Sequence, residues 1–325
     1  MAEPPLHFFS ILYRELSYAF IHSTGHDPLI ARANRFIQTP APNRNAHRLI
    51  PIGLGILAKV LIRYIISHVV LSILILETAE QQTNTSKPGD NKSSPSSRQL
   101  LRTTAVFYHK GGLRLLLNGI GSACTYWLMH TSVTKISTTL LPHPIAHILT
   151  SVLLAESHFF WTARTILPPD QLRLVPNPHD YQRWKALIPA TLVYATSEIV
   201  MMLVSGLFDV PLPVTTTGLS WFVGSDVLRY GLVLAVQMFL IFPAYILLIM
   251  VQGSLLPPTC ETLVFAQLQR GRRVGEIFSG EGGVGDVVKM LGVKQLLWCL
   301  ELHGKMGLCL VGVAAVVHSV VYSLV

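Results

Sequence analysis

The sequence predicts an all-α fold, an integral membrane bundle of six transmembrane helices in three pseudo-repeats of two helices. Two features of the composition point to a membrane: half of the 325 residues are hydrophobic, and only 13% are charged. A soluble domain has about 25% charged residues, and its single core cannot bury so much apolar surface. The recurrence of long apolar runs, with basic loops between some of them, supplies the third observation.

Six apolar runs are each near or above the roughly 20 residues that a helix needs to cross the hydrocarbon core. They extend from Leu49 to Leu76, Leu115 to Leu141, His143 to Leu167, Ile188 to Phe208, Arg229 to Gly253 and Leu302 to Val325. Several runs contain ionisable side chains. Such side chains are costly in lipid, so we expect them to face the bundle interior or water.

Basic side chains gather in the loops that follow the first, third and fifth runs. The loops at Thr138 to Ala146 and Asp209 to Asp226 contain no Lys or Arg. By the positive-inside rule, the three basic loops share one side of the membrane and both termini lie on the other, although the N-terminal arm is itself basic. The net charge of +8 therefore indicates topology and lipid contact. Nucleic-acid binding is not expected, because no basic patch is interleaved with base-stacking aromatic residues.

The chain also divides into repeats. Each odd run is followed by a basic loop, a short amphipathic stretch and then an even run, which gives three helix pairs. The expected parts are an N-terminal arm with an amphipathic helix at 1–48, repeat 1 at 49–141, repeat 2 at 142–208 and repeat 3 at 209–325. Residues 81–97 are polar and contain proline and glycine, which predicts a flexible insertion within repeat 1.

A short motif follows the third run: Pro168, Pro169 and Asp170 precede Gln171, Leu172 and Arg173. GGLRLLLNGIG at 111–121, LGVKQLLWCL at 291–300 and WKALIPA at 184–190 share a further pattern, a short helix that leads into an even run. In these features the chain resembles the mitochondrial solute carrier family, which has three repeats of two spans and the motif P-x-[DE]-x-x-[KR] after each odd span.

The resemblance implies a multi-pass protein of a mitochondrial membrane, inner or outer, with bound lipid such as cardiolipin as a partner. It also assigns Pro168, Asp170 and Arg173 to a gate. Proline would kink the odd helix, and the acid and base would pair between neighbouring repeats. Repeats 1 and 3 depart from the motif at Ile75 to Glu80 and at Pro257 to Thr262, so a closed ring of three ion pairs is not expected.

The first functional hypothesis is a transporter that moves a small solute by alternating access to a central site. The candidate substrate-binding residues are Lys59, Arg63, Glu156, Glu198 and Lys305. Lys59 and Arg63 are four residues apart and share one helix face, which suits an anionic solute, whereas the two glutamates do not. These charges could instead pair with one another and hold the bundle together.

The alternative is a carrier-like adaptor of the mitochondrial outer membrane that does not transport and serves docking or membrane dynamics through a membrane-protein partner. The degenerate gate and the long N-terminal arm favour it, whereas the polar residues inside the spans favour transport. We do not expect an enzyme, because the sequence shows no nucleophile with a base. The 13 histidines give no full metal-ligand set, although His143 and His147 have a permissible spacing. No cofactor or metal is predicted.

Overall fold

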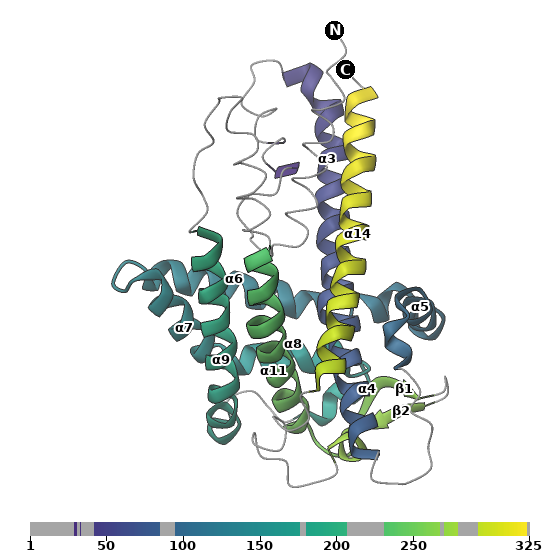
Figure 1. Cartoon of the computed structure of the whole chain (residues 1–325), viewed down its shortest axis with the longest axis vertical. Helices are drawn as coiled ribbons and strands as arrows, with labels where there is room; N and C mark the ends of the chain where they lie inside the picture. Colours follow the sequence, from purple (N-terminus) through teal and green to yellow (C-terminus); the bar gives the residue numbers. More distant parts are fainter. Residues whose placement is uncertain are drawn as a thin grey trace. The chain divides into compact units, whose positions relative to one another are not determined.

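The computed structural model describes residues 29–30, 33, 42–84, 95–175, 180–206, 231–266, 270–278 and 292–323. These residues are mostly helical and belong to two compact units (Figure 1). The first unit takes the described residues within Met1–Ser67, Val204–Ala235 and Glu301–Val325, and the second takes those within His68–Leu203 and Val236–Leu300. The amphipathic helix expected in the N-terminal arm lies outside the described residues.

Two long helices form the first unit. Helix α3 (Pro42–Arg63) lies beside the part of α14 (Val293–Ser323) that follows Glu301 (Figure 1). Gly55 permits their close approach, because a Cβ at this position would lie 2.5 Å from Cγ2 of Val317. Ser67 Oγ donates a hydrogen bond to Met306 Sδ at 2.9 Å. The buried apolar cluster of this unit is Leu29, Ile52, Val317 and Val321.

The second unit is a set of shorter helices. In chain order these are the π-helix η1 (Tyr64–Val70), α4 (Leu71–Asn84), η2 (Ser96–Arg98), α5 (Leu100–Leu116), α6 (Ile120–Ser137), α7 (His143–Leu153), α8 (Ala155–Ile166), η3 (Gln171–Leu174), α9 (Tyr181–Gly206), the π-helix η5 (Gln237–Ile241), α11 (Phe242–Ser254) and α12 (Val274–Ile277). The first residues of η1 and the last of α9 belong to the first unit. Helix α4 contacts α8 and α11, and Ala244 to Gly253 of α11 are all buried. The core of this unit therefore lies around α4 and α11.

A β-hairpin follows α11, where the sequence predicted only a basic loop and a short helix. Strand β1 (Glu261–Ala266) pairs antiparallel with β2 (Arg270–Arg273), and Glu261 lies opposite Arg273. Two prolines, Pro257 and Pro258, precede it, and proline cannot continue a helix without losing a hydrogen bond. The β-branched and apolar residues of β1 then favour a strand. The hairpin packs on α4 through β1.

Four helices of the described residues are long and apolar enough to cross a membrane. They are Leu49–Gln81, Tyr181–Val204, Gly231–Ser254 and Val293–Ser323. They correspond to the first, fourth, fifth and sixth predicted runs, so the structure supports a helical membrane protein with these four spans. The other two predicted spans and the three-repeat arrangement are not among these four helices and stay predictions.

The second and third predicted runs have a different structure. Within Leu115 to Leu141, helix α6 starts only after a turn in which Gly119 adopts a left-handed conformation with φ of 80°. Within His143 to Leu167, the chain forms two helices, α7 and α8, separated at Leu154, where ψ is 11°. Hydropathy alone did not detect either break, because the residues at both breaks are small or apolar.

The predicted flexible insertion at 81–97 requires a correction at both of its ends. Helix α4 continues through Asn84. At the other end Pro95 and Ser97 are buried, and η2 begins at Ser96. Two of the polar residues that predicted flexibility, Ser96 and Ser97, donate hydrogen bonds from their hydroxyl groups to Glu77 of α4. Residues 85–94 lie outside the described residues.

Candidate functional site

The five predicted substrate-binding residues are divided between the two units. Lys59, Arg63 and Lys305 belong to the first unit, and Glu156 and Glu198 to the second. Lys59 is buried with 4% exposure. Lys305 Nζ donates to Glu301 Oε1 at 2.8 Å, one turn earlier on the same helix. Glu301 is not one of the five candidate residues, and this ion pair joins neighbouring turns of α14.

Glu156 has a structural role at the start of α9. Its carboxylate forms an ion pair with Nη2 of Arg183 and accepts a hydrogen bond at 3.0 Å from the backbone N–H of Asp180. The Arg183 guanidinium also lies over the rings of Phe159 and Phe160, at 4.9 and 5.2 Å from their centroids. Because both charges are largely buried and paired, Glu156 fastens α9 to α8.

The gate motif lies in the turn after α8. Asp170 and Arg173 are both exposed, and Asp170 Oδ2 accepts a hydrogen bond from Gln171 Nε2 at 3.3 Å. Among the described residues neither side chain forms an ion pair. Asn118 Nδ2 donates to the carbonyl of Leu167 at 2.9 Å, so the GGLRLLLNGIG segment contacts the end of α8 just before Pro168.

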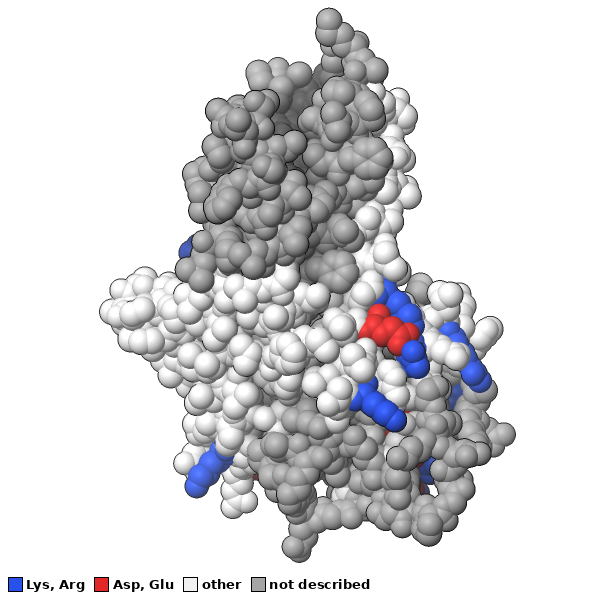
Figure 2. All heavy atoms as spheres, in the orientation of Figure 1, with Lys and Arg blue, Asp and Glu red and all other residues white. Residues whose placement is uncertain are grey.

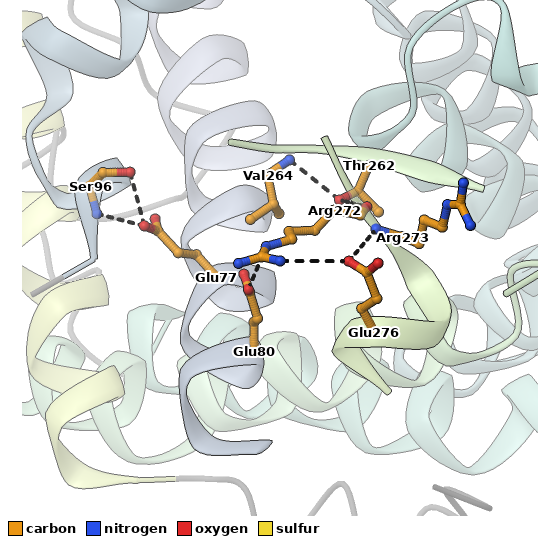
Figure 3. Close-up of polar contacts among 8 residues, drawn as sticks. All are labelled: Glu77, Glu80, Ser96, Thr262, Val264, Arg272, Arg273 and Glu276. Atoms are coloured by element: carbon orange, nitrogen blue, oxygen red, sulfur yellow. Dashed lines mark hydrogen bonds and ion pairs between the residues drawn. The ribbon is translucent and has the colours of Figure 1, made fainter. Parts of the chain in front are cut away.

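Glu77, in the stretch where repeat 1 departs from the carrier motif, binds the start of η2 (Figure 3). Its Oε1 accepts the backbone N–H of Ser96 at 2.7 Å and the Ser96 hydroxyl at 2.9 Å. Its Oε2 accepts the backbone N–H of Ser97 at 3.0 Å and the Ser97 hydroxyl. One carboxylate thus satisfies the backbone donors at the start of a helix that lies 19 residues away along the chain.

Glu80, one turn further along α4, binds the hairpin (Figure 3). Arg272 Nε of β2 lies 2.8 Å from Glu80 Oε1, and Arg272 Nη1 lies 3.8 Å from Glu276 Oε2. Thr262 Oγ1 of β1 donates to the backbone carbonyl of Arg272 at 2.8 Å. The acids of repeat 1 therefore hold η2 and the hairpin on α4.

A polar and aromatic cluster of buried and half-buried side chains lies in the second unit. It has two parts. The first, named the Glu198 arm, consists of Glu198, His147, His130, Ser151 and Tyr194. His147 Nε2 lies 3.1 Å from Glu198 Oε2, and Tyr194 lies one turn before Glu198 on α9. His130 Nε2 lies 3.0 Å from Ser151 Oγ, and its ring centroid is 4.9 Å from that of His147.

The second part, named the His158 arm, consists of His158, His68, Trp161, Gln252 and Tyr126. Gln252 Nε2 lies 2.9 Å from Nδ1 of His158. The ring of Trp161 lies 4.6 Å from that of His68 and 4.9 Å from that of His158. Tyr126 joins the arms, since its ring centroid is 5.0 Å from that of His158 and 5.6 Å from that of His130.

Two buried polar atoms of the His158 arm have no hydrogen-bond partner among the described residues. They are the indole Nε1 of Trp161, a donor, and the amide Oε1 of Gln252, an acceptor. The two residues are 4% and 1% exposed. An unsatisfied buried polar group costs about 1–3 kcal/mol, so native proteins normally give it a partner. A water or a solute with its own donor and acceptor would satisfy both atoms.

Of this cluster, the sequence identified Glu198 and the spacing of His143 and His147. The other members come from η1, α6, α7, α8, α9 and α11, and most of them are too far apart in the sequence to form a local pattern. The described residues contain no group of three or more His, Cys, Asp or Glu side chains that could hold a metal ion.

Outside these clusters the surface carries many apolar side chains. On the face drawn in Figure 2 the described residues are mostly neither basic nor acidic. Large apolar side chains with more than half of their area exposed include Leu57 of α3, Leu128 of α6, Leu203 of α9 and Leu308 of α14. Such surfaces suit lipid. Comparison with family models, curated proteins and solved structures finds no match to this chain.

Proposed function

We propose that this chain is a carrier-like membrane transporter of a small polar solute, with six spans in three pseudo-repeats, located in a mitochondrial membrane. The solute would bind at the His158 arm during alternating access. The observation that carries the proposal is the pair of buried, unpartnered atoms, Trp161 Nε1 and Gln252 Oε1. Polar groups inside a membrane either pair with one another or mark substrate and ion pathways, and these two atoms have no hydrogen-bond partner among the described residues.

The arrangement narrows the class of solute. Trp161 offers an N–H donor and Gln252 a carbonyl acceptor, so a solute that carries both an acceptor and a donor fits best. The surrounding rings of His68, His158 and Tyr126 would cover its apolar part. The basic pair Lys59 and Arg63, which suggested an anionic solute, belongs to the other unit. The charged side chain within the two arms is the carboxylate of Glu198.

The test is uptake of labelled metabolite pools by liposomes that contain the purified chain. Trp161→Phe removes the unpartnered N–H and leaves a smaller aromatic ring. The matched control is Trp184→Phe, because Trp184 Nε1 donates to the carbonyl of Val152 at 2.9 Å and is therefore already satisfied. We expect Trp161→Phe to lower uptake per folded molecule about tenfold, the loss of roughly 1.4 kcal/mol of binding, and to lower stability by about 1–2 kcal/mol through the smaller ring.

The control should lose stability without losing uptake. Trp184→Phe should reduce thermal stability by about 1 kcal/mol and leave uptake per folded molecule unchanged. Equal uptake by Trp161→Phe and the parent chain would contradict the assignment of the His158 arm as the binding site. Absence of uptake from every pool, by protein that is folded, would contradict transport itself.

The second candidate function is the non-transporting adaptor. Glu156 and Lys305 are engaged in ion pairs with Arg183 and Glu301, which favours a bundle whose charges hold it together. The exposed Asp170 and Arg173 would then be available to a membrane-protein partner. Folded protein that shows no uptake, and whose Glu156→Gln variant loses stability, is the result that supports the adaptor.

A further inference from the structure

We propose that the Glu198 arm is a proton-binding site, and that a proton bound by Glu198 and His147 accompanies the solute. This inference rests on the proposed transport function and adds the coupling ion to it. The geometry that motivates it is a carboxylate and an imidazole 3.1 Å apart, with the imidazole side chain 9% exposed. An added proton can bind the ring nitrogen of His147 that does not face Glu198, so neither side chain has to move.

The charge of this pair changes with one proton. Glu198 carboxylate with neutral His147 carries one negative charge, whereas the pair with one more proton is neutral overall. A net charge in an apolar span is costly, and the protonated pair avoids this cost. When the imidazolium gives its Nε2 proton to the carboxylate, the products are a neutral imidazole and a neutral carboxylic acid. No other bond changes.

The neighbouring hydrogen bonds fix which ring nitrogens take part. Ser151 Oγ donates its only hydrogen to the backbone carbonyl of His147 at 2.9 Å. Ser151 must therefore accept from His130, which places the hydrogen of His130 on Nε2 and leaves Nδ1 as an acceptor. Ser151 thus positions the ring of His130, whereas its contact with His147 is to the backbone alone.

An exposed histidine lies one turn before His147. His143 is exposed at the start of α7, and its ring stacks at 6.3 Å from that of His147. Of the pair's own side chains, His147 is 9% exposed and Glu198 is 33% exposed. The pair therefore lies one helical turn from an exposed histidine, and Glu198 itself keeps a partly exposed side chain.

Several other titratable groups face the pair from the helices packed around it. Helix α6 contributes His130 and Tyr126, α8 contributes His158, and α9 contributes Tyr194; each interacts electrostatically with Glu198. Tyr245 of α11 lies next to Tyr194, with 5.8 Å between the ring centroids. Glu198 is the carboxylate among these groups, so its substitution is the direct test.

The first measurement is independent of transport. Infrared difference spectra of the full chain in liposomes, recorded as the pH is lowered, should show a carboxylic-acid C=O band that appears with protonation. One component of this band should be absent from Glu198→Gln and shifted in His147→Gln, and the control Asp170→Asn should retain it. A wild-type spectrum that Glu198→Gln does not alter would overturn the proton site, whatever the uptake experiment shows.

The second measurement tests coupling. Liposomes with a pH-sensitive dye inside should report proton entry together with solute uptake, and an inward proton gradient should accelerate uptake about tenfold, equivalent to 1.4 kcal/mol of driving force. Glu198→Gln should keep downhill uptake and lose the acceleration. Uptake without proton entry would overturn coupling and leave the transport proposal standing, whereas absence of uptake would contradict transport alone.

Discussion

Glu80 Oε1 lies 2.8 Å from Arg272 Nε, an ion pair between the end of α4 and the second strand of the hairpin (Figure 3). The Glu80 side chain is 9% exposed and that of Arg272 is 42% exposed. The carboxylate is thus held close to buried, while the guanidinium keeps part of its contact with water. The pair joins two residues that are 192 positions apart in the sequence, and it leads to the first prediction.

Arg272→Gln should destabilise the folded chain by about 1–2 kcal/mol, since it removes the ion pair of a nearly buried carboxylate while the exposed half of Arg272 was screened by solvent. The control is Arg273→Gln, because the Arg273 side chain points away from Glu80 and Glu276 (Figure 3). It should change the stability by less than about 0.5 kcal/mol. Thermal unfolding in detergent checks both, and equal losses would contradict a specific role for the ion pair.

Glu77→Ala should loosen the start of η2 and α5. The substitution removes the acceptor of two backbone N–H groups and two hydroxyls, which should cost about 2 kcal/mol. Hydrogen exchange measured by mass spectrometry should become faster at Ser96 and Ser97 and stay unchanged in α11. Glu77→Gln keeps one acceptor oxygen, so its exchange rates at Ser96 and Ser97 should lie between those of the parent chain and of Glu77→Ala. Unchanged exchange in Glu77→Ala would refute the role of Glu77 as a cap.

Two glycines of α3 provide a matched pair for the packing against α14. A Cβ at Gly55 would lie 2.5 Å from Val317, whereas a Cβ at Gly53 would meet nothing within 4 Å. Gly55→Ala should therefore lower stability by about 1–3 kcal/mol through overpacking. Gly53→Ala should raise it by about 0.5–1 kcal/mol, because alanine is the better helix former. Unfolding of both variants in the same detergent distinguishes them, and similar shifts would contradict close contact of these helices.

Asp170 and Arg173 test whether the carrier-like motif still acts as a gate. Both are exposed and form no ion pair among the described residues. The single changes Asp170→Lys and Arg173→Glu should therefore alter stability by less than about 0.5 kcal/mol. A gate that closes by ion pairing with neighbouring repeats should nevertheless lose transport in each single variant. Uptake unaffected by either change would show that the motif has no gating role in this chain.

The sequence predicted helices well where apolar runs are long and end in polar or proline-containing segments. The runs that contain α3, α9, α11 and α14 each correspond to a candidate span, because hydropathy is summed over many residues and single exceptions matter little. It predicted the region of α6, α7 and α8 less well, since the breaks at Gly119 and Leu154 depend on a few backbone angles. The hairpin depends on pairing between strands and on its contact with α4, which no local pattern encodes.

By itself the sequence determined that the chain is apolar, helical and suited to a membrane, and it singled out Glu198 as an ionisable group within a span. Only the tertiary structure decided what each charge does. In the folded chain Glu156 forms an ion pair with Arg183, Glu80 forms one with Arg272, and Glu198 lies beside His147. The physical reason is that burial of a charge depends on its partner, and these partners come from segments whose separation in sequence carries no signal until the helices pack.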